Sequence, residues 1–324
     1  MPGGYGRKSF VGWDQEGTWG TGVAATKFAE LINESMDIIR ERVPRPVVRG
    51  LFAAREGNTY DAKFGAGGKF VIEGNFIGLL RLLEHAFGDA SGSTAATEPG
   101  VRYTHTFNLK ETPMTGKGLS LHINTDVDNG GTPQRRYNGF KIDSLKFSYD
   151  PRRNVQIEVG GAAKDHTDIA AVSATFPASA QYIAGHQTVL EIDDVATKFD
   201  SVDLTLNLAL DLDKRIMGSK FIDEPVRDGQ ISIDGELNKD AAASDMTKFR
   251  DGTLFKVELI STGATLGAGT YKQTLIGLKA EAVGDPYKVT TPGLMKSRIP
   301  FRLLEPTAGE TLQILIENNE AAIA

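Results

Sequence analysis

The 324-residue sequence predicts a mainly β (α+β) fold made of two tandem β-sandwich or β-barrel modules, each with one flanking helix. Three observations lead to this prediction. Segments in which apolar and polar residues alternate are far more numerous than segments with helical spacing, which indicates antiparallel sheet. The two helical patterns lie far apart, one in each half of the chain. The order of the segments also recurs, which indicates an internal repeat.

The clearest strand pattern covers residues 202–212, VDLTLNLALDL, in which every second residue from Val202 to Leu212 is apolar. Leucine favours helices, but a period of two places all the leucines on one face only in a strand. We therefore expect one long strand with one buried face and one polar face. Shorter patterns of the same period predict strands at residues 103–109, 119–123, 155–159, 230–234, 254–260 and 311–316.

Helical spacing occurs at residues 75–86, where apolar residues recur three and four positions apart, and Gly88 follows as a C-cap. A weaker pattern at residues 240–249 is followed by Gly252. The sequence therefore predicts one helix in each module.

Two short segments repeat in the same order. ATKF occurs at residues 25–28 and again at 196–199, and GKFVIEG at residues 68–74 matches GQISIDG at residues 229–235 in its glycines, its alternation and its carboxylate. Each glycine-bounded segment precedes a predicted helix and then a strand. We expect an N-terminal arm (1–24), a first module (25–165), a linker (166–186) and a second module with a C-terminal strand (187–324).

Composition excludes several classes of protein. The chain has no cysteine, so it has neither disulfides nor thiolate metal sites. Its 36 basic and 42 acidic residues give a net charge of -6, which disfavours a protein that grips nucleic-acid phosphates. The longest apolar helical run, residues 76–83, contains Arg81 and is much shorter than the roughly 20 residues of a membrane span. The N-terminal residues lack the apolar stretch of a signal peptide.

A search for catalytic or metal-binding motifs leads to the prediction that the chain has no catalytic residue, no metal site and no cofactor, and is not an enzyme. The five histidines form no metal-ligand motif. The glycines at residues 65–68 and 267–269 do not open a helix after a strand, so flexible loops are favoured over phosphate sites. Residues 126–131 resemble a calcium loop, but Tyr137 stands where the bidentate glutamate belongs, which favours a hairpin loop.

Residues 15–28, QEGTWGTGVAATKF, resemble the opening of tail tube proteins of long-tailed, siphovirus-type bacteriophages. The similarity continues through residues 68–88 and through RIPFRLLE (298–305) and TLQILIENN (311–319), while residues 40–67 and 124–139 depart from it.

The resemblance implies a structural virion protein whose β-sandwich modules form rings that stack into a hollow tail tube for the phage genome. Family members with two fused modules close as trimers with pseudo-sixfold symmetry, and the internal repeat fits this subset. If each module supplies four strands to the wall, a ring holds about 24 strands around a cylinder roughly 50 Å across.

The partners implied are other copies of the chain, the tail initiator, the terminator and the tape-measure protein. Double-stranded DNA would be present only in transit, and no membrane is involved. The protein would assemble in the host cytoplasm and reside in the virion tail. Two alternatives stay open: a hexameric tube protein with one tube domain and a decoration domain, and a two-domain β-sandwich that binds carbohydrate or a cell surface.

A conduit for DNA should not hold phosphates, so its wall should lack lysine clusters. Because the leucine face of residues 202–212 is core, the opposite face is expected to line the tube, unless it is ordinary solvated surface. The residues expected to face the lumen are Asp203, Thr205, Asn207, Asp211, Asp213, Ser232, Asp234, Asn33, Ser35, Asp37, Glu73 and Glu158.

Residues 40–67 form a long segment of mixed charge that contains Pro44 and Pro46. The resemblance implies that this extended loop reaches the next ring, with residues 215–228 as its shorter counterpart; a mobile surface loop is the alternative. The residues expected at the contact between rings are Arg40, Arg42, Arg45, Arg49, Arg55, Glu56 and Asp61.

Overall fold

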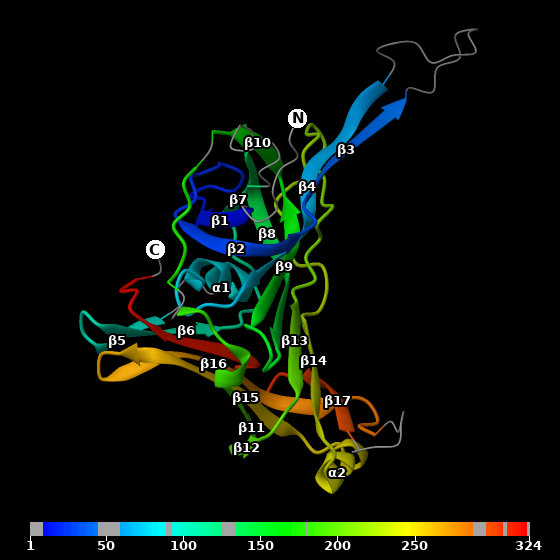
Figure 1. Cartoon of the computed structure of the whole chain (residues 1–324). Helices are drawn as coiled ribbons and strands as arrows, with labels where there is room; N and C mark the ends of the chain where they lie inside the picture. Colours follow the sequence, from blue (N-terminus) through cyan, green and yellow to red (C-terminus); the bar gives the residue numbers. More distant parts are fainter. Residues whose placement is uncertain are drawn as a thin grey trace.

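The computed structural model describes residues 9–44, 59–88, 93–124, 134–170, 172–178, 181–287, 296–306 and 310–322. These residues fold into strands far more than helices (Figure 1), so the prediction of a mainly β fold is confirmed. The strands are β1 Phe10–Gln15, β2 Lys27–Glu34, β3 Asp37–Pro44, β4 Thr59–Glu73, β5 Ser93–Glu98, β6 Arg102–Asn108, β7 Leu119–Asn124, β8 Gln134–Tyr149, β9 Gln156–Ala163, β10 Asp165–Ile169, β11 Thr188–Ile192, β12 Val195–Thr197, β13 Ser201–Asn207, β14 Ser232–Asp240, β15 Phe255–Leu266, β16 Gly269–Ala282, β17 Lys296–Leu303 and β18 Leu312–Asn318.

Both predicted helices are present, α1 at Leu80–Phe87 and α2 at Ala243–Asp251. Each ends at the predicted glycine, Gly88 or Gly252, which adopts the left-handed conformation that favours glycine. A short 3₁₀ helix, η3 at Gly185–Gln187, precedes β11.

The first half of the chain closes into a six-stranded barrel. Its strands pair antiparallel in the cyclic order β1–β2–β4–β9–β8–β7–β1. Phe70, Ile72, Phe140 and Val159 are fully buried inside it, and α1 packs against the same core through Phe87 and its neighbours. Closure leaves these strands without the open edges that promote aggregation, except where a strand extends beyond its partner.

Seven strand pairings of the first half recur in the second half in the same chain order. In the first half these pairings are β1–β7, β1–β2, β2–β4, β4–β9, β7–β8, β8–β9 and β8–β10. Their counterparts in the second half are, in the same order, β11–β15, β11–β12, β13–β14, β14–β17, β15–β16, β16–β17 and β16–β18. Helix α1 follows β4 as α2 follows β14. The first half adds two hairpins without a counterpart, β3 with the outer part of β4, and β5–β6.

Two strand pairings join the halves. The second part of β8 pairs with β13, and β18 pairs with β6, so residues 102–108 belong to a sheet made mostly by the second half. Strand β10 occupies the first residues of the predicted linker. The domain boundaries remain a prediction, but the backbone pairing is continuous across them.

The long strand expected at residues 202–212 is wrong in its length, because β13 ends at Asn207. The Asn207 side chain accepts a hydrogen bond from the Ala209 amide at 2.9 Å, which forms an Asx turn, and Ala209 has a φ of 51°. Leu208 and Leu210 are still buried. The alternation therefore continues past the strand because the leucines reach the same core from a turn.

Candidate functional site

One polar face runs across six neighbouring strands, β4, β9, β8, β13, β14 and β17. The pairing register places side chains from all but the first of these strands in a single row, in which Glu158 lies opposite Lys146, Lys146 opposite Thr205, Thr205 opposite Asp234, and Asp234 opposite Arg302. The other side of these strands carries the buried apolar residues. We call this surface the charged face.

The charged face holds bases as well as acids. Its ion pairs are Lys69–Glu158 at 2.8 Å, Lys146–Asp203 at 3.4 Å, Arg302–Asp234 at 2.8 Å, and Arg298–Glu236. The hydrogen bond from the Arg298 guanidinium holds the pKa of Glu236 below its usual value. Each base is thus held by a carboxylate, and the face is nearly balanced in charge.

Seven of the residues expected to face a lumen share the charged face: Glu73, Glu158, Asp203, Thr205, Asn207, Ser232 and Asp234. Reasoning on one strand missed the bases, because they lie on the neighbouring strands β4, β8 and β17. The alternation within residues 296–303 was the available signal, since it places Arg298 and Arg302 on one face.

Asn33, Ser35 and Asp37 do not lie on one strand. A register shift between Leu31 and Asn33 turns the chain, β2 ends at Glu34, and Asp37 begins β3. All three candidate residues are exposed. Asn33 lies opposite Val71, which lies opposite Glu158, so this residue extends the charged face onto β2, whereas Ser35 and Asp37 follow the strand at the edge of the barrel.

Asp211 and Asp213 do not continue the row on β13, because the strand ends before them. Asp211 accepts a hydrogen bond from the Asp213 amide at 3.1 Å. Asp213 contacts Lys63 and Arg215, and the hydrogen bonds from these two bases lower the pKa of its carboxyl. The expectation that both carboxylates extend the face of this strand is therefore wrong.

The predicted loop at residues 40–67 is a hairpin in its described part. β3 and the outer half of β4 extend away from the rest of the chain (Figure 1). Asp61 accepts two hydrogen bonds of 3.0 Å from Arg40 and one of 3.2 Å from Arg42, and Arg40 lowers its pKa. Arg45, Arg49, Arg55 and Glu56 lie outside the described residues.

The loop between β13 and β14 lies against the base of this hairpin. The Phe64 amide donates to the Lys220 carbonyl at 2.8 Å, and the rings of Phe64 and Phe221 are 5.6 Å apart. Arg215 lies 3.6 Å from Glu41. The predicted counterpart, residues 215–228, therefore braces the hairpin rather than standing apart from it.

The family model described as phage tail tube protein matches residues 6–303. The chain belongs to the phage tail tube protein family. This match confirms the resemblance to a phage tail tube protein and identifies a structural component of the virion tail that self-associates into a tube. No curated protein matches the chain.

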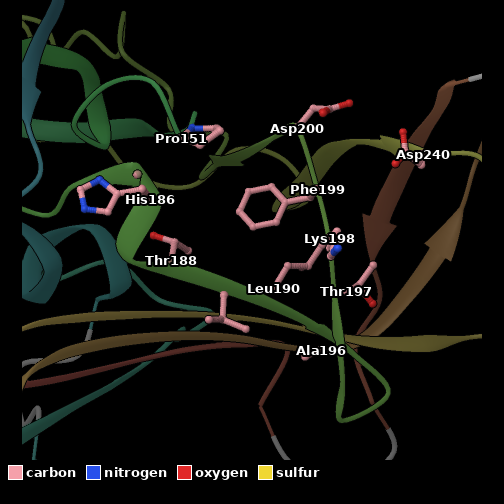
Figure 2. A pocket seen from close by; sticks show the side chains of 12 residues that line it. Pro151, His186, Thr188, Leu190, Ala196, Thr197, Lys198, Phe199, Asp200 and Asp240 are labelled. Carbon is pink, nitrogen blue, oxygen red and sulfur yellow. The ribbon is translucent and has the colours of Figure 1, made fainter. Parts of the chain in front are cut away.

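The described part of this tail tube protein contains no helix that is long and apolar enough to cross a membrane. A surface hollow of about 690 Å³ lies beside β11, β12 and the start of β13. His186 lies on the opposite side of this hollow from Asp240 (Figure 2), while Lys296 binds both Asp240 and Asp200. The geometry does not bring the histidine and the carboxylates together for catalysis.

Glu191, Asp194 and Glu258 of the tube protein approach one another closely enough to hold a cation. Lys256, however, already binds Asp194 and Glu258 at 2.7 Å each, and these contacts raise the pKa of its ammonium group. The lysine neutralises part of the cluster, which is therefore explained as a surface ion-pair group.

Proposed function

We propose that three copies of this chain close into a ring with pseudo-sixfold symmetry, and that the rings stack into the hollow tube of a siphovirus-type tail through which the genome passes. The observation that carries the proposal is the recurrence of seven strand pairings in the two halves. Two halves with the same pairings can occupy equivalent positions in a ring, so three chains supply six similar units.

The continuous sheet supports the same geometry. Strands β2, β4, β9 and β8 of the first half and β13, β14, β17 and β16 of the second half are neighbours in that order. Three chains with four such strands in each half give a cylinder roughly 50 Å across. Side chains would narrow it to about 40 Å, which is wide enough for duplex DNA.

The charged face is the surface that we place toward the lumen. DNA is held by bases that are free to neutralise phosphates and release counterions. On this face Lys69, Lys146, Arg298 and Arg302 are each engaged by a carboxylate of the same chain. A wall of this kind presents polar groups to water without a net positive field, so DNA can move along it.

The β3–β4 hairpin is the element that we place between stacked rings. A contact between rings needs an element that projects and keeps its direction. The base of the hairpin is held by the loop at residues 208–231 through Phe64, Phe221, Lys63 and Asp213. Within the tail we expect the tube to contact the initiator, the terminator and the tape-measure protein, and we expect no enzymatic activity.

End-on electron microscopy of tails from particles that carry this chain tests the proposal. Threefold rings with six similar lobes around a channel would support it. Sixfold rings of whole chains would overturn the trimer and the equivalence of the halves. Discrete particles that never form part of a tube would overturn the tube itself and would favour a binding module.

A further inference from the structure

The strands that carry the charged face are flanked by β2 at one end and by β16 at the other, and part of the outer edge of each flanking strand has no partner among the described residues. On β2, pairing with β1 ends at Glu30, while the strand continues to Glu34. On β16, pairing with β15 ends at Ala280, while the chain runs on along β17. Unpaired edges are templates for pairing with another chain, so each edge needs an explanation.

The pairing of β8 with β13 inside the chain provides that explanation. β8 leaves β7 at Phe140 and runs on with β9 along one edge and β13 along the other. β16 leaves β15 at Ala280 in the same way, and β17 lies along the edge that corresponds to β9. The other edge of β16, which corresponds to the edge of β8 that pairs with β13, is the unpaired one.

The other unpaired edge belongs to the strand that corresponds to β13. β13 pairs with β14 on one side and with β8 on the other. Its counterpart β2 pairs with β4 as β13 pairs with β14, but beyond Glu30 its second side has no described partner. The chain thus carries one complete junction, β8–β13, and the two separate sides of a second one.

We propose that a second copy of this chain completes this junction: residues 282–284, at the end of β16 and just beyond it, pair antiparallel with residues 32–34 on β2 of the next copy, with Ala282 opposite Glu34. The inference rests on the proposed ring and names the contact that closes it. The contact is head to tail, because each copy offers β2 on one side and β16 on the other. Such contacts generate rings when the rotation closes.

The backbone on both edges is oriented for this pairing. The Ser35 amide donates to the Lys69 carbonyl on β4 at 2.8 Å, so the alternation of backbone groups turns the Glu34 amide toward the unpaired edge. The Val283 amide donates to the Pro300 carbonyl on β17 at 2.9 Å, so the amide of the preceding strand residue, Ala282, turns the other way. Each edge therefore presents an amide to the partner.

Each of the two edges also carries an exposed apolar side chain. Ile32 is 45% exposed and Val283 is 49% exposed, which is unusual for large apolar residues on otherwise polar strand surfaces. Ala29 and Ala282 point into the core, and both exposed residues lie on the opposite side of the sheet. Lys146 and Asp203 form an ion pair on this side of the internal junction. Between copies, Ile32 and Val283 would cover each other instead.

Cysteine cross-linking tests the junction, because the chain has no native cysteine. The variant carries Ile32→Cys together with Val283→Cys, and a short bifunctional thiol reagent is added to isolated tails. We expect a shift from monomer to covalent trimer on a denaturing gel, with dimers and linear trimers at partial reaction and circular trimers when all three junctions have reacted. Each single variant should stay monomeric. As a matched control, Lys146→Cys with Thr205→Cys joins direct cross-strand partners and should cross-link within one chain.

Tails that contain the double variant but yield only monomer would overturn the junction and leave the tube function standing. Absence of the wild-type chain from tail tubes would overturn the proposed function itself. A second variant, Val283→Asp, should keep the unfolding midpoint of the isolated subunit and lose incorporation into tubes, whereas Val189→Asp, at an equally exposed valine on β11, should keep both. Normal incorporation of Val283→Asp would contradict the proposed contact.

Discussion

Lys146 on β8 and Asp203 on β13 form an ion pair of 3.4 Å across the strand pairing that joins the two halves of the chain. Beneath this exposed pair, Leu145, Phe147, Leu204 and Leu206 are buried. An exposed ion pair contributes about 0–1 kcal/mol, whereas each buried side chain contributes more. The junction between the halves is therefore held chiefly by its apolar side, and the charged side is free to serve another purpose.

Truncation on the apolar side should weaken the subunit strongly. Leu204→Ala leaves a cavity at a residue that is 2% exposed, and we expect a loss of about 2–5 kcal/mol in the free energy of unfolding. Asp203→Ala on the opposite face of the same strand should cost at most about 1 kcal/mol. Urea denaturation of both variants measures the difference, and equal losses would contradict this division.

The turn after β13 stores backbone strain. Ala209 has a φ of 51°, a conformation that costs an L-residue about 1–2 kcal/mol but that glycine adopts freely. Relief of this strain in Ala209→Gly is partly offset because glycine loses more entropy on folding. We therefore expect the free energy of unfolding to rise by about 0.5–1 kcal/mol. Thr205→Gly, within the strand, should lower it. A destabilised Ala209→Gly variant in thermal or urea unfolding would refute the assignment.

The subunit should lose stability as the pH falls below about 6.5. Burial, together with the charges of Lys141 and Arg81, lowers the pKa of His85 from 6.5 to about 3. At a pH between these two pKa values, His85 binds a proton in the unfolded chain but not in the folded chain, so acidification favours unfolding. The loss from this residue reaches about 2 kcal/mol at pH 5.

His85→Phe should therefore flatten the dependence of the unfolding free energy on pH over this range. His186→Gln, at an exposed histidine, serves as the matched control and should reproduce the slope of the wild type. If the His85→Phe curve ran parallel to that of the wild type, the buried neutral histidine would not explain the acid sensitivity.

Reversing charge on the charged face should slow passage of DNA without preventing assembly. Asp203→Lys with Asp234→Lys removes the partners of Lys146 and Arg302 and leaves several free bases on the wall. We expect severalfold slower ejection that recovers at higher salt, because phosphate binding is salt dependent. The control, Asp168→Lys with Asp251→Lys, makes the same change in charge at exposed residues of β10 and α2, away from this face. Equal ejection rates for the two pairs would count against a lumen at the charged face.

Replacing residues 46–57, between the two strands of the β3–β4 hairpin, with a short glycine-rich turn should block stacking and leave a folded subunit. The cut spares β4, whose inner half belongs to the closed barrel. Sedimentation should show an unchanged subunit, and electron microscopy should show isolated rings. Tubes of normal length would exclude residues 46–57 as the contact between rings.

The alternation of apolar residues determined much of this protein from the sequence alone. A period of two forces neighbouring side chains to opposite faces, so the strands, the buried leucines of residues 202–206 and the polar face opposite them were predictable. The glycines after the two helices were equally readable, because a left-handed residue ends a helix. The family followed from short segments such as residues 15–28.

Tertiary structure decided where strands end and which strands are neighbours. The period of two persists past Asn207, and only the turn at Ala209 separates Asp211 and Asp213 from the charged face. No local pattern places Lys146 beside Asp203, since that contact depends on pairing between residues far apart in the chain. The charge balance of the face, the closed barrel and the two unmatched edges arise from such long-range pairings, whose register is set by the packing of the whole core.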